Sequence, residues 1–310
     1  MSLEGGSPSG ASIRARLLNI AKREERDFNV VLNLYYQERL LARLAASDFR
    51  KRFLLKGGLL LSAVPASQER VFGRPTKDVD LRAAGVGNDP HRLRTIFAEI
   101  CRLDLSDGIA FDPDGITTER ITEDADYHGI RLRIPVRLSG ALGRVQVDIG
   151  FGDIVTPGPQ ERVFPVLLER LAAPTLLTYP VETVVAEKFE AMIRLSLVNS
   201  RMKDFFDLHW LASTQPFEGS LLQRAISNTF GRRETPFLPD PAVFQSSFAS
   251  DEGHQRQWSA FLQRSHLAGA PTRFEEVLLL LRRFLQPVHS ACLEGETLAG
   301  KWSPVLLAWV

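Results

Sequence analysis

Apolar and polar residues alternate strictly in two neighbouring stretches of the sequence, residues 130–138 and 144–150. Successive side chains of a β-strand point to opposite faces, so a period of two places the apolar residues on one face of a sheet. Residues 53–55 form a further short apolar strand candidate ahead of a glycine pair. These patterns predict a mixed α/β core, with half-buried strands, over residues 50–180.

Apolar residues recur at helical spacing over residues 12–46, with no Pro or Gly inside the stretch, which predicts two helices before the sheet. The same spacing predicts a helix over residues 89–103. Beyond Pro180 the pattern is helical, and loops with Pro and Gly separate the elements. The helices expected there span residues 181–197, 202–212, 221–230, 251–265 and 273–285. The sequence therefore predicts a leader with N-terminal helices (1–50), an α/β core (51–180) and a helical domain (181–310).

The chain has 310 residues, of which 44% are hydrophobic and 24% charged, and this composition is typical of a globular protein with a substantial core. No apolar run approaches the roughly 20 residues of a membrane-spanning helix, and no secretory signal is present, so we expect a cytoplasmic protein. The two cysteines, Cys101 and Cys292, lie far apart in the sequence, which argues against a disulfide framework and a thiolate zinc site. Residues 1–10, rich in Gly and Ser, are predicted to be a flexible leader.

The formal net charge is +1, which argues against a protein that coats nucleic acid by unselective electrostatics. The charge is uneven, because residues 13–56 contain eleven Lys and Arg against five Asp and Glu, an excess of six. This segment is compatible with a surface that faces a polyanion. It is equally compatible with arginines that are solvated or paired within the protein.

Asp78 and Asp80 flank Val79 in a segment with strand periodicity. Side chains two residues apart on a strand share a face, roughly 7 Å from each other, so both carboxylates project together while Val79 enters the core. Hard oxygen ligands without His or Cys favour Mg²⁺ or Mn²⁺, which takes its remaining ligands from water and substrate phosphates. A pair of solvated carboxylates gives the same pattern, so the pair alone leaves both interpretations open.

A glycine turn lies between the first strand candidate and a helix that starts near Leu59. Gly57 and Gly58 carry no Cβ, so their backbone N–H groups can approach a triphosphate closely, with Lys56 beside them. The alternative is a simple strand-to-helix turn with Lys56 in solvent. The turn therefore indicates a triphosphate-binding site only in combination with the acidic residues.

The stretch 145–150 places Val145, Val147 and Ile149 on one face of a strand and Asp148 on the other. If this strand lies beside that of Asp78 and Asp80, three carboxylates converge. Such a triad can hold two metal ions, one at the nucleotide triphosphate and one at an attacking hydroxyl, as phosphoryl and nucleotidyl transfer require. Asp148 then completes the second metal site or serves as a base; a lone strand aspartate would be structural.

Ordered motifs of this chain resemble those of a known family. The motifs are Leu55-Lys56-Gly57-Gly58, Arg74-Pro75-Thr76-Lys77-Asp78-Val79-Asp80-Leu81, Val147-Asp148-Ile149-Gly150, and the paired downstream segments Ala186-Glu187-Lys188-Phe189-Glu190-Ala191 and Asn199-Ser200-Arg201-Met202-Lys203-Asp204-Phe205-Phe206-Asp207-Leu208. In this order they resemble the AbiEii/AbiGii toxin branch of the nucleotidyltransferase superfamily. Position 58 is Gly where many relatives carry Ser, so no serine role is carried over.

The resemblance implies an α/β (α+β) fold, in which a nucleotidyltransferase-like mixed sheet is flanked by N-terminal helices and a helical C-terminal region. It implies Mg²⁺-dependent (or Mn²⁺-dependent) transfer of a nucleotide from an NTP to RNA, with the tRNA 3′ end as the favoured acceptor. It further implies a toxin of a bacterial toxin–antitoxin or phage-defence pair, with a cognate antitoxin.

The same resemblance assigns roles to individual residues. The metal ligands would be Asp78, Asp80 and Asp148. The nucleotide-binding residues would be Lys56, Gly57, Gly58, Lys188 and Arg201. Lys188 and Lys203 would neutralise phosphate charge, Lys188 as a mobile ammonium, while Asp204 and Asp207 would orient these lysines or the acceptor. Local ion pairing on a solvated helix face is the alternative for the downstream motifs.

Three other functions remain compatible with the residues. A nucleotidyltransferase of this kind can modify a protein or a small molecule in place of RNA. A phosphotransferase would transfer the γ-phosphate of the NTP. A noncatalytic nucleotide- or RNA-binding module would keep the fold without turnover, and the intact acidic residues Asp78, Asp80 and Asp148 argue against it.

Overall fold

The structure is a computed structural model that describes residues 9–65, 74–124, 127–265, 267 and 269–310. The described residues form two compact units. The first unit contains residues 9–65, 74–152 and 160–178, and the second contains residues 153–159 and 179–310. The predicted leader, residues 1–10, lies outside the described residues apart from Ser9 and Gly10.

The first unit begins with the two predicted helices, α1 (Gly10–Arg23) and α2 (Phe28–Ala46). Each starts at a side chain that accepts a hydrogen bond from the first turn: the Ser9 hydroxyl accepts from the Ser12 N–H, and the Asp27 carboxylate accepts from the Asn29 N–H. Such caps satisfy backbone donors that have no partner within the helix. The N-terminal helical prediction is therefore confirmed.

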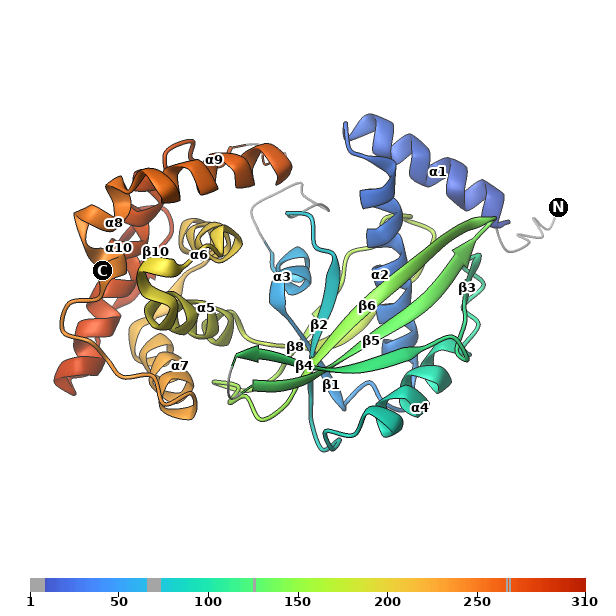
Figure 1. Cartoon of the computed structure of the whole chain (residues 1–310), viewed down its shortest axis with the longest axis horizontal. Coiled ribbons are helices and arrows are strands. Elements are labelled where there is room, and N and C mark those ends of the chain that lie inside the picture. Colours follow the sequence, from blue (N-terminus) through green and yellow to red (C-terminus); the bar gives the residue numbers. More distant parts are fainter. Residues whose placement is uncertain (1–8, 66–73, 125–126, 266, 268) are drawn as a thin grey trace. The chain divides into compact units, whose positions relative to one another are not determined.

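An eight-stranded mixed sheet forms the centre of the described part of this unit (Figure 1). Its order is β3-β5-β6-β2-β1-β8-β7. β4 also pairs with β5, along a different part of that strand from β3. The β2–β6 and β1–β8 pairs are parallel, and the other pairs are antiparallel. The strands are β1 (Phe53–Lys56), β2 (Asp78–Ala83), β3 (Ile109–Phe111), β4 (Thr117–Asp124), β5 (Tyr127–Leu138), β6 (Ala141–Gly150), β7 (Gln160–Val163) and β8 (Thr175–Thr178). The predicted mixed α/β fold is confirmed.

One face of this sheet is apolar, as the alternating pattern predicts. Val79 and Leu81 of β2 and Val145, Val147 and Ile149 of β6 are each at most 1% exposed. Helix α2 packs against β6, and α4 (Pro90–Cys101) contacts both α2 and β4. The aspartates of β2 and β6 therefore lie on the opposite face of the sheet.

Four strands of the sheet, β3, β4, β7 and β8, have no counterpart among the predicted elements. β4 has the sequence TTERITED, which is too polar for an alternating apolar pattern. β3, β7 and β8 are three or four residues long. Strands this short or this polar form because neighbouring strands supply the hydrogen bonds, and local sequence does not report that pairing.

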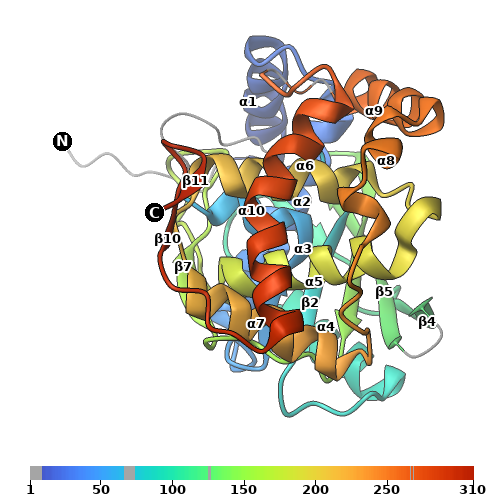
Figure 2. The same cartoon turned by 90° about the vertical axis from the view of Figure 1, so that its left-hand side faces the viewer.

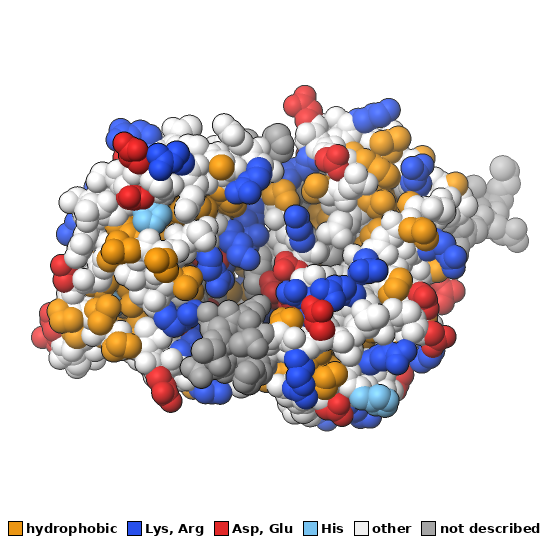
Figure 3. All heavy atoms as spheres, in the orientation of Figure 1, with side chains coloured by type: hydrophobic (Ala, Val, Ile, Leu, Met, Phe, Trp, Pro, Cys, Tyr) orange, Lys and Arg blue, Asp and Glu red, His pale blue; other side chains and the backbone are white. Residues whose placement is uncertain are grey.

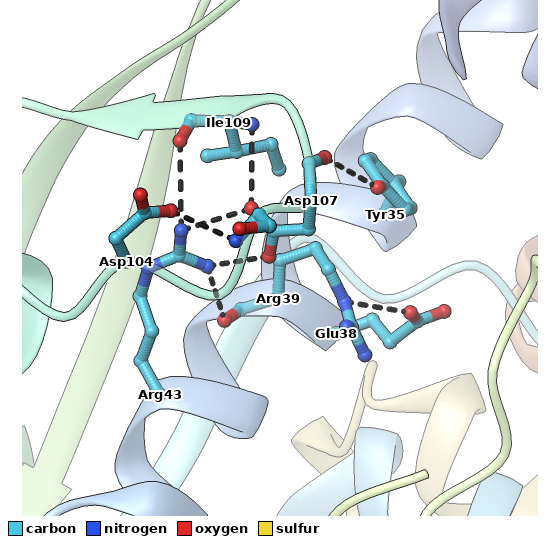
Figure 4. Close-up of polar contacts among 8 residues, drawn as sticks. Tyr35, Glu38, Arg39, Arg43, Asp104, Asp107 and Ile109 are labelled. Carbon is cyan, nitrogen blue, oxygen red and sulfur yellow. Dashed lines mark hydrogen bonds and ion pairs between the residues drawn. The ribbon is translucent and has the colours of Figure 1, made fainter. Parts of the chain in front are cut away.

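A buried ionic cluster joins α2 to the loop before β3 (Figure 4). The Arg43 guanidinium donates to both carboxylate oxygens of Asp107, at 2.7 and 2.9 Å, and the Tyr35 hydroxyl donates to the Asp107 backbone oxygen at 2.9 Å. Arg39 pairs with Glu38 at 2.9 Å, and the Glu38 carboxylate accepts from the Leu167 N–H. Arg39 and Arg43 are at most 2% exposed. These two arginines of the basic N-terminal segment are thus internal ion-pair partners and not part of a polyanion-binding surface.

The second unit is mainly helical. Its longer helices are α5 (Val181–Leu195), α6 (Met202–Thr214), α7 (Gly219–Arg232), α9 (Glu252–Ser265) and α10 (Phe274–Glu294). Helix α10 packs against α6 and α7 (Figure 2). Each predicted C-terminal helix corresponds to one of these, although α10 continues past Pro287 to Glu294. A proline normally ends or kinks a helix, so the sequence pattern placed this end too early.

A small sheet completes the second unit, with the order β11-β10-β9. It consists of β9 (Phe217–Glu218), β10 (Lys301–Ser303) and β11 (Ala308–Trp309). Trp302 is buried, and its indole N–H donates to the Ala212 backbone oxygen at 2.7 Å. The sheet thus ties the last residues of the chain to the end of α6.

Basic and acidic side chains are interspersed on the face of the molecule drawn in Figure 3, in keeping with the net charge of +1. Among the described residues, no helix is both long enough and apolar enough to span a membrane.

Candidate active site

Charged residues of five neighbouring strands in the first unit lie on one line across the sheet. In the parallel β2–β6 pair Asp80 is opposite Asp148, and in the antiparallel β5–β6 pair Asp148 is opposite Arg131. The line continues on β4 with Glu119 and on β1 with Lys56, which is opposite Asp80. Directly opposite residues share a face of the sheet and come within contact distance. Strand pairing therefore brings together charges that are far apart in the sequence.

Three carboxylates converge on this face. Asp78, Asp80 and Asp148 each offer an oxygen, and these oxygens all lie within 4.8 Å of one another. Asp78 and Asp80 are half-buried and Asp148 is buried. Three carboxylates so close repel one another unless a cation joins them, and an all-oxygen donor set fits a hard divalent ion such as Mg²⁺. The donor chemistry of this chain is therefore suited to the predicted metal ion.

Asp148 is also held by hydrogen bonds from its own sheet. Arg131 donates from Nε to Oδ1 and from Nη2 to Oδ2, both at 2.7 Å. Gln146 donates from Nε2 to Oδ2 at 3.2 Å. The hydrogen bonds to Asp148 raise the pKa of Arg131, which stays a cation at any pH at which the protein is folded. The orientation of the Asp148 carboxylate is thus fixed before any ligand binds.

The glycine turn lies directly beside this acidic site. Gly57 has a φ of +67°, and a Cβ added there would overlap the Asp80 carboxylate. At Gly58 an added Cβ would lie 2.8 Å from Cζ of Arg74 and 2.9 Å from Oγ1 of Thr76. The Arg74 guanidinium therefore occupies the space beside Gly58. Gly57 is required by its positive φ and by the close approach of Asp80, whereas a Cβ at Gly58 would meet only the movable side-chain ends of Arg74 and Thr76.

A second polar cluster, in the second unit, is formed by the downstream motifs on α5 and α6. The Lys188 ammonium lies 2.6 Å from Asp204 Oδ1 and 2.8 Å from Asp207 Oδ2. Arg201 lies 2.6 Å from the other oxygen of Asp204. Lys188 is 9% exposed and the two aspartates at most 1%, so the ammonium is held between two buried carboxylates and is not the extended, mobile group that the sequence suggests.

Burial and charge act in opposite directions on Asp204. Burial by itself would raise the pKa of this carboxyl, but the nearby charges of Lys188 and Arg201 outweigh that effect and lower the pKa to about 2. Asp204 is therefore ionised at neutral pH and forms a stable anchor for the two cations. Lys203, next to it on α6, is exposed at the surface.

Glu190 forms a separate structural network further along α5. This fully buried carboxylate accepts from Arg194 at 2.9 Å, Arg233 at 2.6 Å and the Thr235 hydroxyl at 2.7 Å. Arg233 and Thr235, which follow α7 in the chain, donate to different oxygens of this carboxylate. The network therefore connects α5 to the end of α7. Glu190 thus serves stability, whereas Lys188, two residues earlier, belongs to the motif cluster.

The predicted site residues fall into two groups. Lys56, Gly57, Gly58, Asp78, Asp80 and Asp148 lie together in the first unit, and Lys188, Arg201, Lys203, Asp204 and Asp207 lie together in the second. Sequence reasoning missed Gln146 and Arg131, which both donate to Asp148, and Arg131 is the cation of the two. The alternating pattern does place Arg131 at a polar position of β5. Which residue Arg131 pairs with depends on the strand register, which the pattern does not give.

Comparison with known families identifies the chain. Residues 39–279 match the sequence model of the nucleotidyl transferase AbiEii toxin, from a type IV toxin–antitoxin system. This match covers more than half of the chain. The chain belongs to the AbiEii family. As an AbiEii protein it is a nucleotidyltransferase of the toxin class, and the family implies an antitoxin partner.

Two solved structures from Helicobacter pylori resemble this AbiEii protein remotely. One is described as a nucleotidyltransferase; it shares 16% identity, covers 86% of this chain and 98% of its own, and has a TM-score of 0.46. The other, JHP933, shares 16% identity, covers 85% of this chain and 94% of its own, and has a TM-score of 0.45. No curated protein matches the chain.

Proposed function

We propose that this AbiEii protein transfers a nucleoside monophosphate from an NTP to an RNA acceptor, in a reaction that requires Mg²⁺ or Mn²⁺. The acceptor is the 3′ end of tRNA, and the transfer inhibits growth in a cytoplasmic toxin–antitoxin or phage-defence system. The observation that carries the proposal is the convergence of Asp78, Asp80 and Asp148 beside the glycine turn of an AbiEii chain.

The residues of the first unit bind the donor nucleotide. Asp78, Asp80 and Asp148 hold the divalent ion, which when bound supplies positive charge to the triphosphate and lowers the energy of the leaving pyrophosphate. The backbone N–H groups of Gly57 and Gly58, in the turn directly after β1, bind the triphosphate. Lys56 adds a cation on the same face of the sheet, opposite Asp80.

The residues of the second unit bind phosphate and position the acceptor. Lys203 is exposed and provides a cation for phosphate. Asp204 and Asp207 hold the Lys188 ammonium in a fixed position, and Arg201 shares the charge of Asp204. A preorganised ammonium stabilises developing phosphate charge more effectively than a flexible one, because it loses less freedom on binding.

The test is label transfer by the purified protein with Mg²⁺, each α-³²P-labelled NTP in turn, and a tRNA pool, total RNA or cell lysate. The proposal predicts label on the 3′ end of tRNA from the α-phosphate and none from γ-³²P-labelled NTPs. Label on a protein or small molecule, or label from the γ-phosphate, would replace the proposal with one of the alternative reactions.

Two variants control this experiment. Asp80→Asn removes one negative ligand of the triad, and we expect transfer to fall by at least about 100-fold. Asp114→Asn makes the same chemical change at a carboxylate with a side chain 90% exposed in the same unit, and transfer should be unchanged. If Asp80→Asn keeps full transfer and full growth inhibition, the noncatalytic binding module becomes the better account of the fold.

A further inference from the structure

A row of arginines leads away from the acidic site along strands β5 and β6. Arg131, Arg133 and Arg137 occupy alternate positions of β5, so their side chains share one face of the sheet. Arg144 of β6 joins the row, because the residue opposite it lies between Arg133 and Arg137. The same face carries Asp148, which is opposite Arg131. The row therefore begins at the candidate metal site and ends near the turn between β5 and β6.

The members of this row differ in their partners. Arg131 pairs with Asp148 at 2.7 Å and lies 3.7 Å from Glu119, and Arg133 pairs with Glu119 at 2.7 Å. Within the described part of the chain, the guanidinium groups of Arg137 and Arg144 have no ion pair or hydrogen bond, and both side chains are exposed. Figure 3 shows Lys and Arg side chains over this part of the sheet. Two uncompensated cations, diagonal neighbours roughly 7 Å apart, thus lie on an open face.

The neighbours of these two arginines leave them accessible. Asp112 lies beside this end of β5, where its backbone N–H donates to the Pro135 oxygen at 3.0 Å. The Oδ1 atom of Asp112 accepts from the N–H groups of two residues in its own turn, so the carboxylate is engaged there. Leu142, opposite Arg137, is 80% exposed. The surface therefore combines two cations with an uncovered apolar side chain.

The position of the row relative to the acidic site decides which substrate it can reach. In the order β5-β6-β2-β1 the glycine turn, which follows β1, lies on one side of the triad, and the arginine row lies on the other. A strand rises about 3.4 Å per residue, which places Arg144 about 14 Å from the level of Asp148 and Arg137 about 20 Å from that of Arg131. The row therefore extends away from the donor nucleotide, over a length of about four to six stacked nucleotides at about 3.4 Å each.

Helix α1 continues the basic surface beyond the end of the row. A Cβ added to Gly10, the first residue of α1, would lie 3.4 Å from Ser139 in the turn between β5 and β6. The helix contains four cations and no acidic residue: Arg14, Arg16, Lys22 and Arg23. The basic segment 13–56 thus divides into the internal arginines of α2 and the largely exposed cations of α1.

We propose that Arg137 and Arg144 bind the phosphate backbone of the RNA acceptor, whose 3′ end lies at the acidic site and whose chain runs over β5 and β6 towards α1. The inference rests on the proposed function, which makes RNA the acceptor. A polyanion fits better than a single nucleotide, because the cations recur along a line longer than one nucleotide. Contacts to phosphate fix the position of the RNA without reading its sequence, and Leu142 offers an apolar contact to a base or ribose.

The test measures the affinity for tRNA by filter binding in EDTA without NTP, so that neither the metal ion nor turnover contributes. The double variant Arg137→Gln/Arg144→Gln removes both charges from exposed positions. Each phosphate contact adds about 0.7 (single strand) to 0.9 (duplex) to the slope of log K against log salt concentration. We expect the slope to decrease by about 1.4 to 1.8 and the affinity to fall at least about tenfold. In the transfer assay the KM for tRNA should rise by the same factor, with kcat and the KM for NTP unchanged.

The matched control makes the same change of net charge elsewhere in the first unit. Arg50 lies in the turn before β1, and Arg92 lies on α4, which packs against α2; both are exposed. Arg50→Gln/Arg92→Gln should keep the wild-type salt slope and the wild-type KM for tRNA. Circular dichroism of both double variants checks that they fold.

The results separate the inference from the proposed function. An unchanged salt slope in the folded Arg137→Gln/Arg144→Gln protein overturns the inference and leaves nucleotide transfer to RNA intact. An equal loss of affinity in the control also overturns it, because net charge would then be the cause. Loss of binding to poly-L-glutamate with unchanged tRNA affinity would assign the two arginines to an acidic protein instead. A wild-type protein that labels no RNA overturns the proposed function, and the salt slope then decides the RNA surface by itself.

Discussion

A Cβ on Gly57 would occupy the space of the Asp80 side chain, at 2.6 Å from Cγ and 2.7 Å from Cβ of that aspartate. Gly57 directly follows β1, and Lys56, the last residue of β1, is opposite Asp80 on the neighbouring strand β2. The glycine turn is thus needed for the position of a candidate metal ligand, and its role is not confined to the chain reversal.

We therefore expect Gly57→Ala to displace Asp80. The positive φ alone costs an alanine about 1 kcal/mol, and the overlap with Asp80 adds to that cost. The variant should lose both thermal stability, measured by scanning calorimetry, and Mn²⁺ binding, measured by equilibrium dialysis. Gly140→Ala is the matched control, since Gly140 also has a positive φ but has no atom within 4 Å of an added Cβ. It should lose only about 1 kcal/mol and bind Mn²⁺ normally; equal Mn²⁺ binding in both variants would contradict the close-approach argument.

The buried pair of Arg43 and Asp107 makes a prediction about the stability of the first unit. Arg43→Ala would leave the Asp107 carboxylate buried without its bidentate partner. Removing one member of such a pair costs roughly 3–5 kcal/mol. Hydrogen exchange of the α2 backbone amides should report the loss, with protection reduced by two orders of magnitude or more. Arg23→Ala, in an exposed pair with Glu24, should change α2 protection by less than about 1 kcal/mol.

Lys188 and Lys203 should behave differently although both belong to the downstream motifs. Lys188→Met removes the cation between Asp204 and Asp207, and we expect roughly 3 kcal/mol of destabilisation together with loss of nucleotide transfer. Lys203→Met changes an exposed side chain, so stability should stay within about 0.5 kcal/mol while transfer falls about tenfold. The fluorescence of Trp210, Trp258, Trp302 and Trp309, which all lie in the second unit, measures both stabilities. An Lys203→Met protein with unchanged transfer would remove Lys203 from the proposed site.

Asp204 predicts an acid-sensitive step in the unfolding of the second unit. Its pKa is lowered from 3.8 to about 2 in the folded state, so the unfolded state binds more protons over this interval. The stabilisation from ionised Asp204 is therefore present above about pH 4 and is lost as the pH falls towards 2, and it amounts to about 2 kcal/mol. Urea unfolding followed by tryptophan fluorescence should show this slope in the wild-type protein and a flatter one in Asp204→Asn. The exposed Asp114→Asn change should leave the slope as it is, and a wild-type slope in Asp204→Asn would contradict the assignment.

Local patterns carried much of the information about the elements. The alternating stretches became β5 and β6, the helical spacing of residues 12–46 became α1 and α2, and the glycine pair became the turn after β1. These features depend on residues a few positions apart, where backbone geometry fixes which side chains share a face. The polar strand β4 escaped this reasoning, because its strand form depends on β5.

The acidic site shows where local reasoning ends. The spacing of Asp78 and Asp80 was enough to place both on one face of β2, but the meeting with Asp148 required β2 and β6 to pair in parallel across a separation of about seventy residues. The same register brought Arg131 to Asp148. The arginines of α1 and α2 illustrate the same limit, since nothing local distinguishes the buried Arg43 from the exposed Arg23.

The sequence by itself determined the strand and helix periods, the residue types able to bind a divalent ion, and the order of the motifs along the chain. Only the tertiary structure decided which charges meet: Asp148 with Asp80 and Arg131, Lys188 with Asp204 and Asp207, and Arg43 with Asp107. The physical reason is that side-chain period is a local property of the backbone, whereas strand register and the burial of charge depend on contacts between residues distant in sequence.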